Sequence, residues 1–183
     1  MGAFVLSGIV SEIILRISQQ LNTKIKAGKL AEMPLDENPY ADWSCHLFTA
    51  ARTQYIILTN TPSLYSCVLH GRGITDQRTF IARALDTIRE FTADDGKPFI
   101  YLKFIAPSSG TVRFAKALNR SVTGSMTEHI HGAKFLLADG MATIEIGYHL
   151  NETPMSALTG PDGRKYGYPQ DIFPNLVDRM GDA

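Results

Sequence analysis

The chain has 183 residues, of which 44% are hydrophobic and 20% are charged, and 18 basic residues balance 18 acidic ones. This length suits one domain with its own core, and the composition is typical of a globular protein. Because the net charge is zero, no overall field attracts nucleic acid, and binding to a polyanion would need a local basic patch.

The first residues do not have the pattern of an export signal. Residues 1–12 begin with the apolar stretch MGAFVL, which lacks the basic segment and the small-residue cleavage site of a signal peptide. No apolar run approaches the roughly 20 residues that a membrane-spanning helix needs. We therefore expect a cytoplasmic protein without a membrane partner, an N-terminal extension over residues 1–12 and a single α+β domain over residues 13–183.

The first elements are short. Residues 13–17 form an apolar run, and Ser18 is expected to cap a helix over residues 19–26. A loop with glycine and proline breakers follows over residues 27–40. Three segments rich in aromatic and β-branched residues come next, with breaks short enough for hairpins, which predicts an antiparallel meander. These segments are residues 42–50, 53–60 and 63–70, and the middle one is apolar enough to be covered on both faces.

Two long amphipathic helices are expected in the second half. Residues 76–96 place their apolar side chains in one sector of a helix, with Thr75 as the cap. A strand is predicted over residues 98–106, and a second long helix begins at Ser109 or Thr111. The remaining predicted elements are the end of that helix at Gly140, a strand over residues 143–150, and short helical pieces over residues 170–180. The predicted fold is an antiparallel meander sheet of about four to six strands packed against the two long helices.

Several stretches of the sequence, taken together, resemble a known protein family. They are DWSCHLFTAARTQYIILTN, SLYS, GRGIT, RALDTIREF, FIAPSSGTVRFAKALNRSVTGSM and LNETPMSAL. Together they resemble a bacterial family of uncharacterised proteins known only as a domain of unknown function. The resemblance extends from about Arg16 to Phe173. It implies no activity, cofactor or catalytic residue.

The cysteine and histidine residues do not have the spacing of a metal-binding motif. Cys45 and Cys67 show no zinc-binding spacing, and we expect two buried free thiols on the first and third strands of the meander. His129 and His131 are two residues apart on a predicted helix, so they point in nearly opposite directions. We expect no metal site and no cofactor, and we interpret His129 as a half-buried histidine whose hydrogen bonds are satisfied.

Three further motifs have a functional and a plain structural interpretation. HGRGITD, residues 70–76, joins a strand to a helix start and carries Arg72, so it suits either an anion site or a simple connection. Ser44 and His46 share one side of a strand but have no acidic partner for nucleophilic catalysis. The LNETP stretch offers Glu152 at a predicted strand exit, where turn chemistry is the simpler explanation.

The richest candidate is the helix through LNRSVTGSMTEHIHGA, residues 118–133. An apolar stripe faces the sheet, whereas the far side carries small and basic residues, among them Lys116, Arg120, Thr123, Gly124, Thr127, His131 and Lys134. Gly124 costs a helix about 1 kcal/mol relative to alanine, so its position needs a reason. We predict a contact surface centred on Arg120, with Asn119 tying the helix to a neighbouring strand or loop. The alternative is a solvated face with a kink at Gly124.

The sequence is compatible with two classes of function. The first is a non-catalytic binding or assembly protein, expected to be a homodimer, that uses the helix face of Arg120 and Gly124. The second is an enzyme acting on a phosphate-bearing or nucleic-acid substrate, built around Arg120, Arg72 and His46. An anionic ligand is the other partner that these side chains would suit. The candidate binding residues are Lys116, Asn119, Arg120, Gly124, His131 and Arg72.

Overall fold

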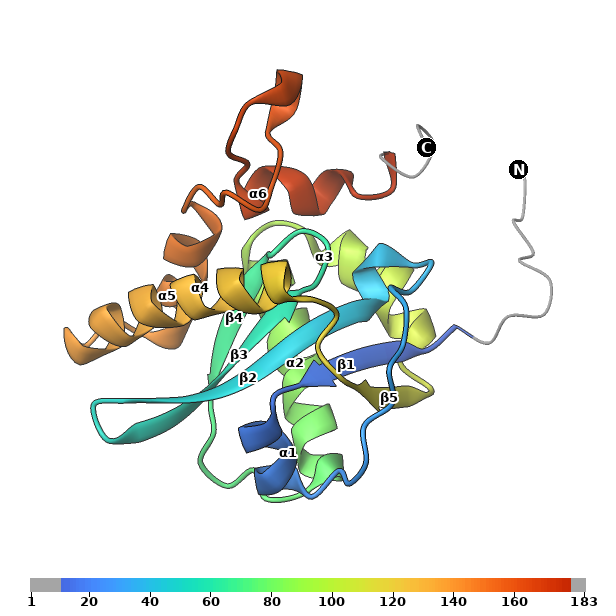
Figure 1. Cartoon of the computed structure of the whole chain (residues 1–183), viewed down its shortest axis with the longest axis vertical. Coiled ribbons are helices and arrows are strands. Elements are labelled where there is room, and N and C mark those ends of the chain that lie inside the picture. Colours follow the sequence, from blue (N-terminus) through green and yellow to red (C-terminus); the bar gives the residue numbers. More distant parts are fainter. Residues whose placement is uncertain (1–10, 179–183) are drawn as a thin grey trace.

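A five-stranded sheet runs through the computed structural model, which describes residues 11–178 (Figure 1). The strands follow the order β4-β3-β2-β1-β5 across the sheet. Their bounds are Ile13–Ile17 for β1, Asp42–Ala50 for β2, Thr53–Asn60 for β3, Ser66–His70 for β4 and Val112–Ala115 for β5. Strands β2, β3 and β4 pair antiparallel, whereas β1 lies parallel to both β2 and β5. The sheet is therefore mixed, and the expected antiparallel arrangement applies only to β2, β3 and β4.

Six α-helices accompany the sheet within the described residues. They are α1 Gln19–Ile25, α2 Gln77–Asp94, α3 Pro98–Ile100, α4 Arg120–Ala138, α5 Thr143–Asn151 and α6 Pro169–Ile172. Ser18 caps α1 as expected, because its side chain accepts a hydrogen bond from the backbone of Leu21. The cap of α2 is Asp76 and not Thr75, with its carboxylate 2.8 Å from the amide nitrogen of Thr79. None of these helices is long and apolar enough to cross a membrane.

Residues 98–108 are helical, so the strand predicted over residues 98–106 is wrong. Helix α3 continues into a π-helical turn over Tyr101–Ile105 and a 3-10 turn over Ala106–Ser108. Ile100 and Ile105 are fully buried, whereas Leu102 is 67% exposed. This one-sided burial belongs to a helix lying on a surface, and the uninterrupted apolar run concealed it.

Residues 143–150 were also expected to be a strand, and they form helix α5 instead. Its buried residues include Ile146, Gly147 and Leu150, which share one helical face. Alternating isoleucines at positions 144 and 146 fit a strand period as well as a helix period over so short a segment. Gly147 is needed for packing, because a Cβ atom there would lie 2.5 Å from the ring of Phe91 on α2.

The second long helix begins about ten residues later than predicted. Neither Ser109 nor Thr111 caps it, because residues 112–115 pair with β1 as strand β5. Its true N-cap is Asn119. The chain leaves the helix through Gly140, whose φ of +86° is the left-handed conformation that glycine tolerates.

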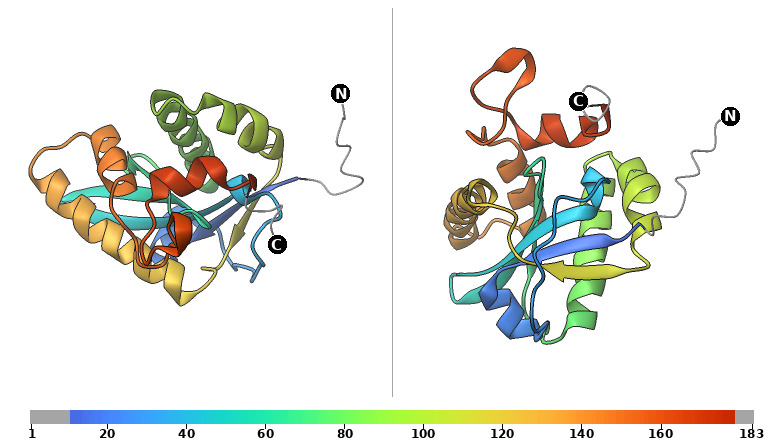
Figure 2. Two further views of the ribbon diagram at one scale, coloured as in Figure 1. Left: turned by 90° about the horizontal axis from the view of Figure 1, so that it is seen from above. Right: turned by 45° about the vertical axis from the view of Figure 1, so that its right-hand side comes forward.

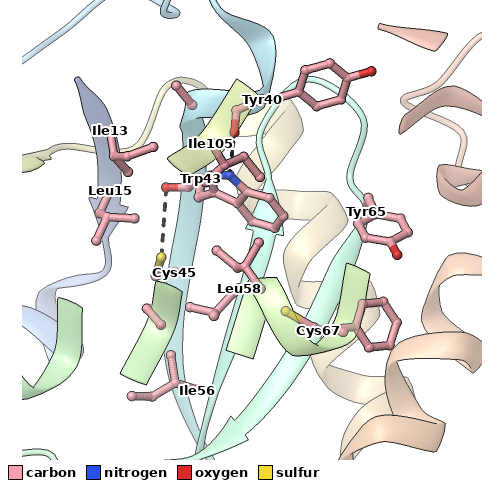
Figure 3. Close-up of a cluster of buried hydrophobic side chains, with 14 of the residues drawn as sticks. Ile13, Leu15, Tyr40, Trp43, Cys45, Ile56, Leu58, Tyr65, Cys67 and Ile105 are labelled. Carbon is pink, nitrogen blue, oxygen red and sulfur yellow. Dashed lines mark hydrogen bonds between the residues drawn. The ribbon is translucent and has the colours of Figure 1, made fainter. Parts of the chain in front are cut away.

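Helices cover both faces of the sheet (Figure 2). The larger core cluster joins β1, β2, β3 and β4 to α2, and it includes Trp43, Leu58 and Phe80. Cys45 and Cys67 lie in the same cluster with β3 between them, since both pair with Leu58 (Figure 3). Both thiols are free and buried, as expected. Burial raises the pKa of each thiol, so both are kept in the unreactive thiol form.

The second core cluster lies on the opposite face of the sheet. Side chains of β2, β3 and β4, such as Phe48, Ile57 and Val68, meet Met126 and Ala133 of α4 there. Residues of α5 complete this cluster. Strand β3 is therefore covered on both faces, as its apolar sequence predicted.

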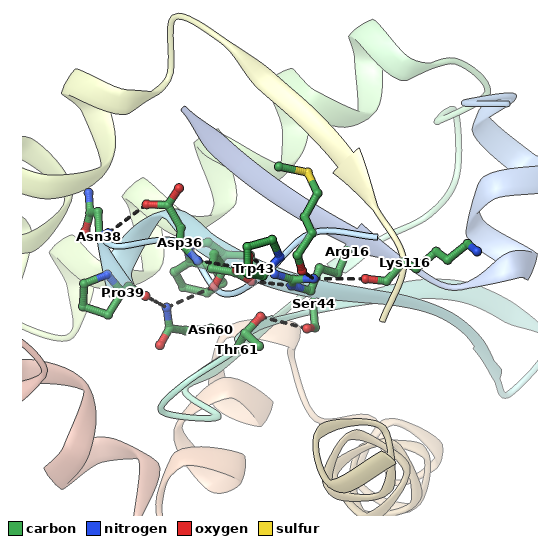
Figure 4. Close-up of polar contacts among 12 residues, drawn as sticks. Arg16, Asp36, Asn38, Pro39, Trp43, Ser44, Asn60, Thr61 and Lys116 are labelled. Carbon is green, nitrogen blue, oxygen red and sulfur yellow. Dashed lines mark hydrogen bonds and ion pairs between the residues drawn. The ribbon is translucent and has the colours of Figure 1, made fainter. Parts of the chain in front are cut away.

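A buried ion pair ties the N-terminal half of the chain to β5 (Figure 4). Arg16 on β1 is 1% exposed and Asp42 on β2 is fully buried. The guanidinium donates two hydrogen bonds of 2.8 Å to the carboxylate of Asp42. Its other N–H groups donate to the carbonyl oxygens of Met33, Pro34 and Lys116. All donors of Arg16 are thus satisfied, and one side chain anchors the loop before β2 and the chain after β5.

Most of the expected N-terminal extension, residues 1–10, lies outside the described residues. The two remaining residues make contacts at the edge of the sheet. Ser11 lies within hydrogen-bond distance of Ser108, and Glu12 forms a 3.4 Å ion pair with Arg113.

Candidate functional site

One side of α4 faces away from the sheet and is exposed along the full length of the helix (Figure 1). We call this side the outer face of α4 and define it by the exposed residues Arg120, Gly124, Thr127, Glu128, His131, Lys134, Phe135 and Ala138. Their spacing of three and four residues keeps them in one stripe. Of the residues predicted to share a helix face away from the core, five are exposed on this side of α4, whereas Thr123 is half-buried and Lys116 precedes the helix; the five are Arg120, Gly124, Thr127, His131 and Lys134.

The beginning of the helix is set by Asn119. Its side-chain oxygen accepts a hydrogen bond of 3.0 Å from the backbone N–H of Val122, which is the usual role of an N-cap. Asn119 therefore supports the helix itself and does not tie it to a neighbouring strand or loop, as had been expected. The inner side of α4 buries Met126, Ala133 and Leu137 in the second core cluster.

Arg120 and Gly124 are both open to solvent. Arg120 forms no ion pair with another residue in the described range 11–178. A Cβ atom built on Gly124 would meet nothing within 4 Å. Helix α4 continues across Gly124 without a break, so the kink considered as an alternative is not observed. Packing within the chain therefore does not require a glycine at this position.

Phe135 is the residue of this face that the sequence analysis missed. Its side chain is 70% exposed, the largest exposed fraction among the large hydrophobic residues of the range 11–178. It follows His131 by four residues, so the helical period that grouped Arg120, Gly124 and His131 also reaches Phe135. Its ring leaves apolar surface in water, and burial against another molecule would remove that surface from water.

Lys116 and Arg72 lie outside the outer face. Lys116 precedes α4, is 55% exposed and forms an ion pair of 3.6 Å with Glu32. Arg72 is exposed in the loop between β4 and α2. This loop lies at the lower end of the sheet in Figure 1, whereas α4 crosses the front. The six candidate residues therefore do not converge on a single site.

A cavity of about 530 Å³ lies beside the N-terminal part of α4. Its lining includes Lys29, His46, Lys116 and Thr123. Burial lowers the pKa of His46, so this imidazole favours its neutral form. Neither Arg120 nor Arg72 lines the cavity, so the three residues considered for phosphate chemistry are not assembled there.

The remaining catalytic candidates have structural roles. The hydroxyl of Ser44 lies 2.8 Å from that of Thr61 and is not paired with His46. The loop after β4 is held by a hydrogen bond of 2.8 Å from Gly71 N to Gln54 O, which suits a plain connection. In the LNETP stretch, Glu152 is the exposed C-cap residue of α5, and the amide of its buried neighbour Asn151 exchanges hydrogen bonds of 2.7 and 3.0 Å with the backbone of Ser66. It thereby covers part of the free edge of β4.

His129 is more deeply buried than expected. Its side chain is only 2% exposed, and Nε2 has no hydrogen-bond partner among the described residues. Burial lowers its pKa to about 4, although a hydrogen bond to the backbone of Leu64 opposes that shift. The expectation of a half-buried, fully satisfied histidine is therefore wrong, and His129 is a neutral core residue with one free ring nitrogen.

The comparison with protein families gives a single result. The sequence model of one protein family, a domain of unknown function named DUF6933, matches residues 14–172. The chain belongs to this family. No curated protein and no solved structure matches this DUF6933 chain. The match confirms the resemblance that the sequence motifs indicated from about Arg16 to Phe173.

Proposed function

We propose that this DUF6933 protein is a non-catalytic assembly protein and that it forms a cytoplasmic homodimer through the outer face of α4. The observation that carries the proposal is the combination of a strongly exposed Phe135 with Gly124 and Arg120 on a single helix face. Two buried free thiols suit a reducing compartment.

The composition of this face supports contact with another protein. Aromatic and arginine side chains contribute most of the binding energy in many interfaces. The open space at Gly124 allows a neighbouring side chain to approach the helix backbone closely. A single helix face is smaller than the roughly 800 Å² per partner of a standard interface, so we expect a dissociation constant on the order of 10 µM.

We expect Phe135→Ala to weaken self-association at least about tenfold, because it removes the main apolar side chain of the contact. Sedimentation equilibrium over about 1 to 200 µM protein measures this change. Leu102→Ala is the matched control, since Leu102 is 67% exposed and lies on the π-helical turn instead of α4. A monomer at all concentrations, or equal effects of the two substitutions, would contradict the proposal.

The alternative function is an enzyme acting on a phosphate-bearing or nucleic-acid substrate. The observation that favours it is the cavity in which Lys29 and Lys116 lie with His46. In that case inorganic phosphate or a nucleotide should raise the melting temperature, and added salt should reduce the effect. Lys29→Ala combined with Lys116→Ala should abolish this response without changing self-association.

A further inference from the structure

We infer that two copies of the chain pack the outer faces of their α4 helices against each other in an antiparallel arrangement. The two-fold axis that relates the copies lies level with the midpoint between His129 and Ile130. This inference rests on the proposed function and adds the orientation of the two helices and the register of the contact.

The charges at the two ends of α4 have signs that are unfavourable for the helix on its own. The positive end of a helix dipole is at the N-terminus, where acidic residues are favourable, and the reverse holds at the C-terminus. Arg120 is the first residue of α4 and Asp139 is its C-cap, and the helix has neither an acidic residue in its first turn nor a basic residue in its last. Both charges therefore oppose the dipole of their own helix. An antiparallel second helix would bring each of them beside a charge of opposite sign.

The exposed residues of α4 are self-complementary about this midpoint. Arg120 precedes His129 by nine residues and Asp139 follows Ile130 by nine. Gly124 and Phe135 are likewise each five residues from the midpoint pair, and Glu128 and His131 are each one residue away. In a two-fold antiparallel pair, residues equally distant from the axis lie level with each other.

The level pairs also match in chemistry and size. Arg120 lies level with the partner's Asp139, which gives an ion pair at each end of the contact. Phe135 lies level with the partner's Gly124, where open space extends beyond 4 Å from the position of a Cβ atom. Glu128 lies level with the partner's His131, which can donate a hydrogen bond to the carboxylate. Three different kinds of pair are thus satisfied by one register, and two-fold symmetry doubles each of them.

A substitution at Gly124 should change the stability of the monomer and the affinity of the dimer in opposite directions. Gly124→Ala should raise the melting temperature of the monomer by roughly 2–4 °C, because alanine favours a helix and the added methyl group meets no other atom. The same methyl group would occupy the space that receives the partner's Phe135. We therefore expect the variant to dimerise at least about fivefold more weakly while being more stable.

The test is a charge exchange. Arg120→Asp and Asp139→Arg should each weaken the dimer about fivefold to tenfold, and the double variant should recover the wild-type dissociation constant to within about threefold. Both substitutions suit the helix dipole, so all three variants should fold, which circular dichroism checks. The control exchanges Asp86 and Arg89, an exposed ion pair on α2, and should leave the dimer unchanged.

A distance measurement tests the orientation independently. A spin label on Ala138→Cys should lie about 26 Å along the helix axes from the label of the second copy in the antiparallel pair, but only about 10 Å away in a parallel pair. Labelling is specific because Cys45 and Cys67 are buried. If Phe135→Ala weakens the dimer but the charge exchange does not restore it, or the label distance is short, the antiparallel register is wrong and the proposed function stands. If wild-type protein remains monomeric, both fail.

Discussion

Replacing Asp42 by alanine is expected to lower the free energy of unfolding by about 3–5 kcal/mol, because it leaves the guanidinium of Arg16 buried without its counter-charge. Arg16 is 1% exposed, so water cannot replace the two hydrogen bonds of 2.8 Å that the carboxylate accepts. Asp42 also accepts a hydrogen bond of 3.3 Å from the backbone of Asp36. Urea unfolding followed by tryptophan fluorescence measures the loss, since Trp43 is the single tryptophan of the chain and is fully buried.

Two comparison variants identify the cause of this loss. Arg16→Lys should destabilise the protein nearly as much as Asp42→Ala, because an ammonium group cannot reach the carboxylate and three backbone carbonyl groups together. Arg113→Ala removes the more exposed ion pair with Glu12 and should cost less than about 1 kcal/mol. If Asp42→Ala costs no more than Arg113→Ala, the buried network does not organise the loop before β2.

The second large effect is expected from acid. As the pH falls from 6.5 to 4, the free energy of unfolding should decrease by about 3 kcal/mol because of His129. Burial lowers the pKa of this histidine from 6.5 to about 4 in the folded state. Between these two pH values the unfolded chain binds a proton that the folded protein does not. The contribution of neutral His129 to the free energy of unfolding is therefore fully present above pH 6.5 and is lost progressively below it. The partnerless Nε2 has no acceptor nearby that would stabilise an added proton.

His129→Leu should make the protein less dependent on pH within this window. His46 also has a lowered pKa, so part of the acid sensitivity should remain in this variant and should decrease further in combination with His46→Asn. Urea unfolding at intervals between pH 4 and pH 7 measures the slope of each variant. An unchanged slope in His129→Leu would mean that other groups cause the acid sensitivity.

Neighbours in the sequence are sufficient to specify the elements that were predicted correctly. Ser18 caps α1 through its own side chain, and the short break at Arg52 closes the hairpin between β2 and β3. The apolar sector of α2 is wide enough to identify a helix from its period alone. The same reasoning placed Arg120, Gly124 and His131 on one face of α4, because a helical period depends only on spacing along the chain.

Contacts between distant segments decided the rest. Residues 143–150 suit a strand as well as a helix, and the close fit of Gly147 against Phe91 belongs to the helix. Strand β5 exists because β1 offers it a parallel edge, which no local pattern of four residues can reveal. The sequence alone determined that the chain is an α+β protein of this family and that α4 carries small and basic residues opposite its apolar stripe. Only the tertiary structure decided that His129 is buried, that Arg72 lies apart from α4 and that Phe135 is exposed on the same helix face as Gly124, because burial depends on which distant elements pack together.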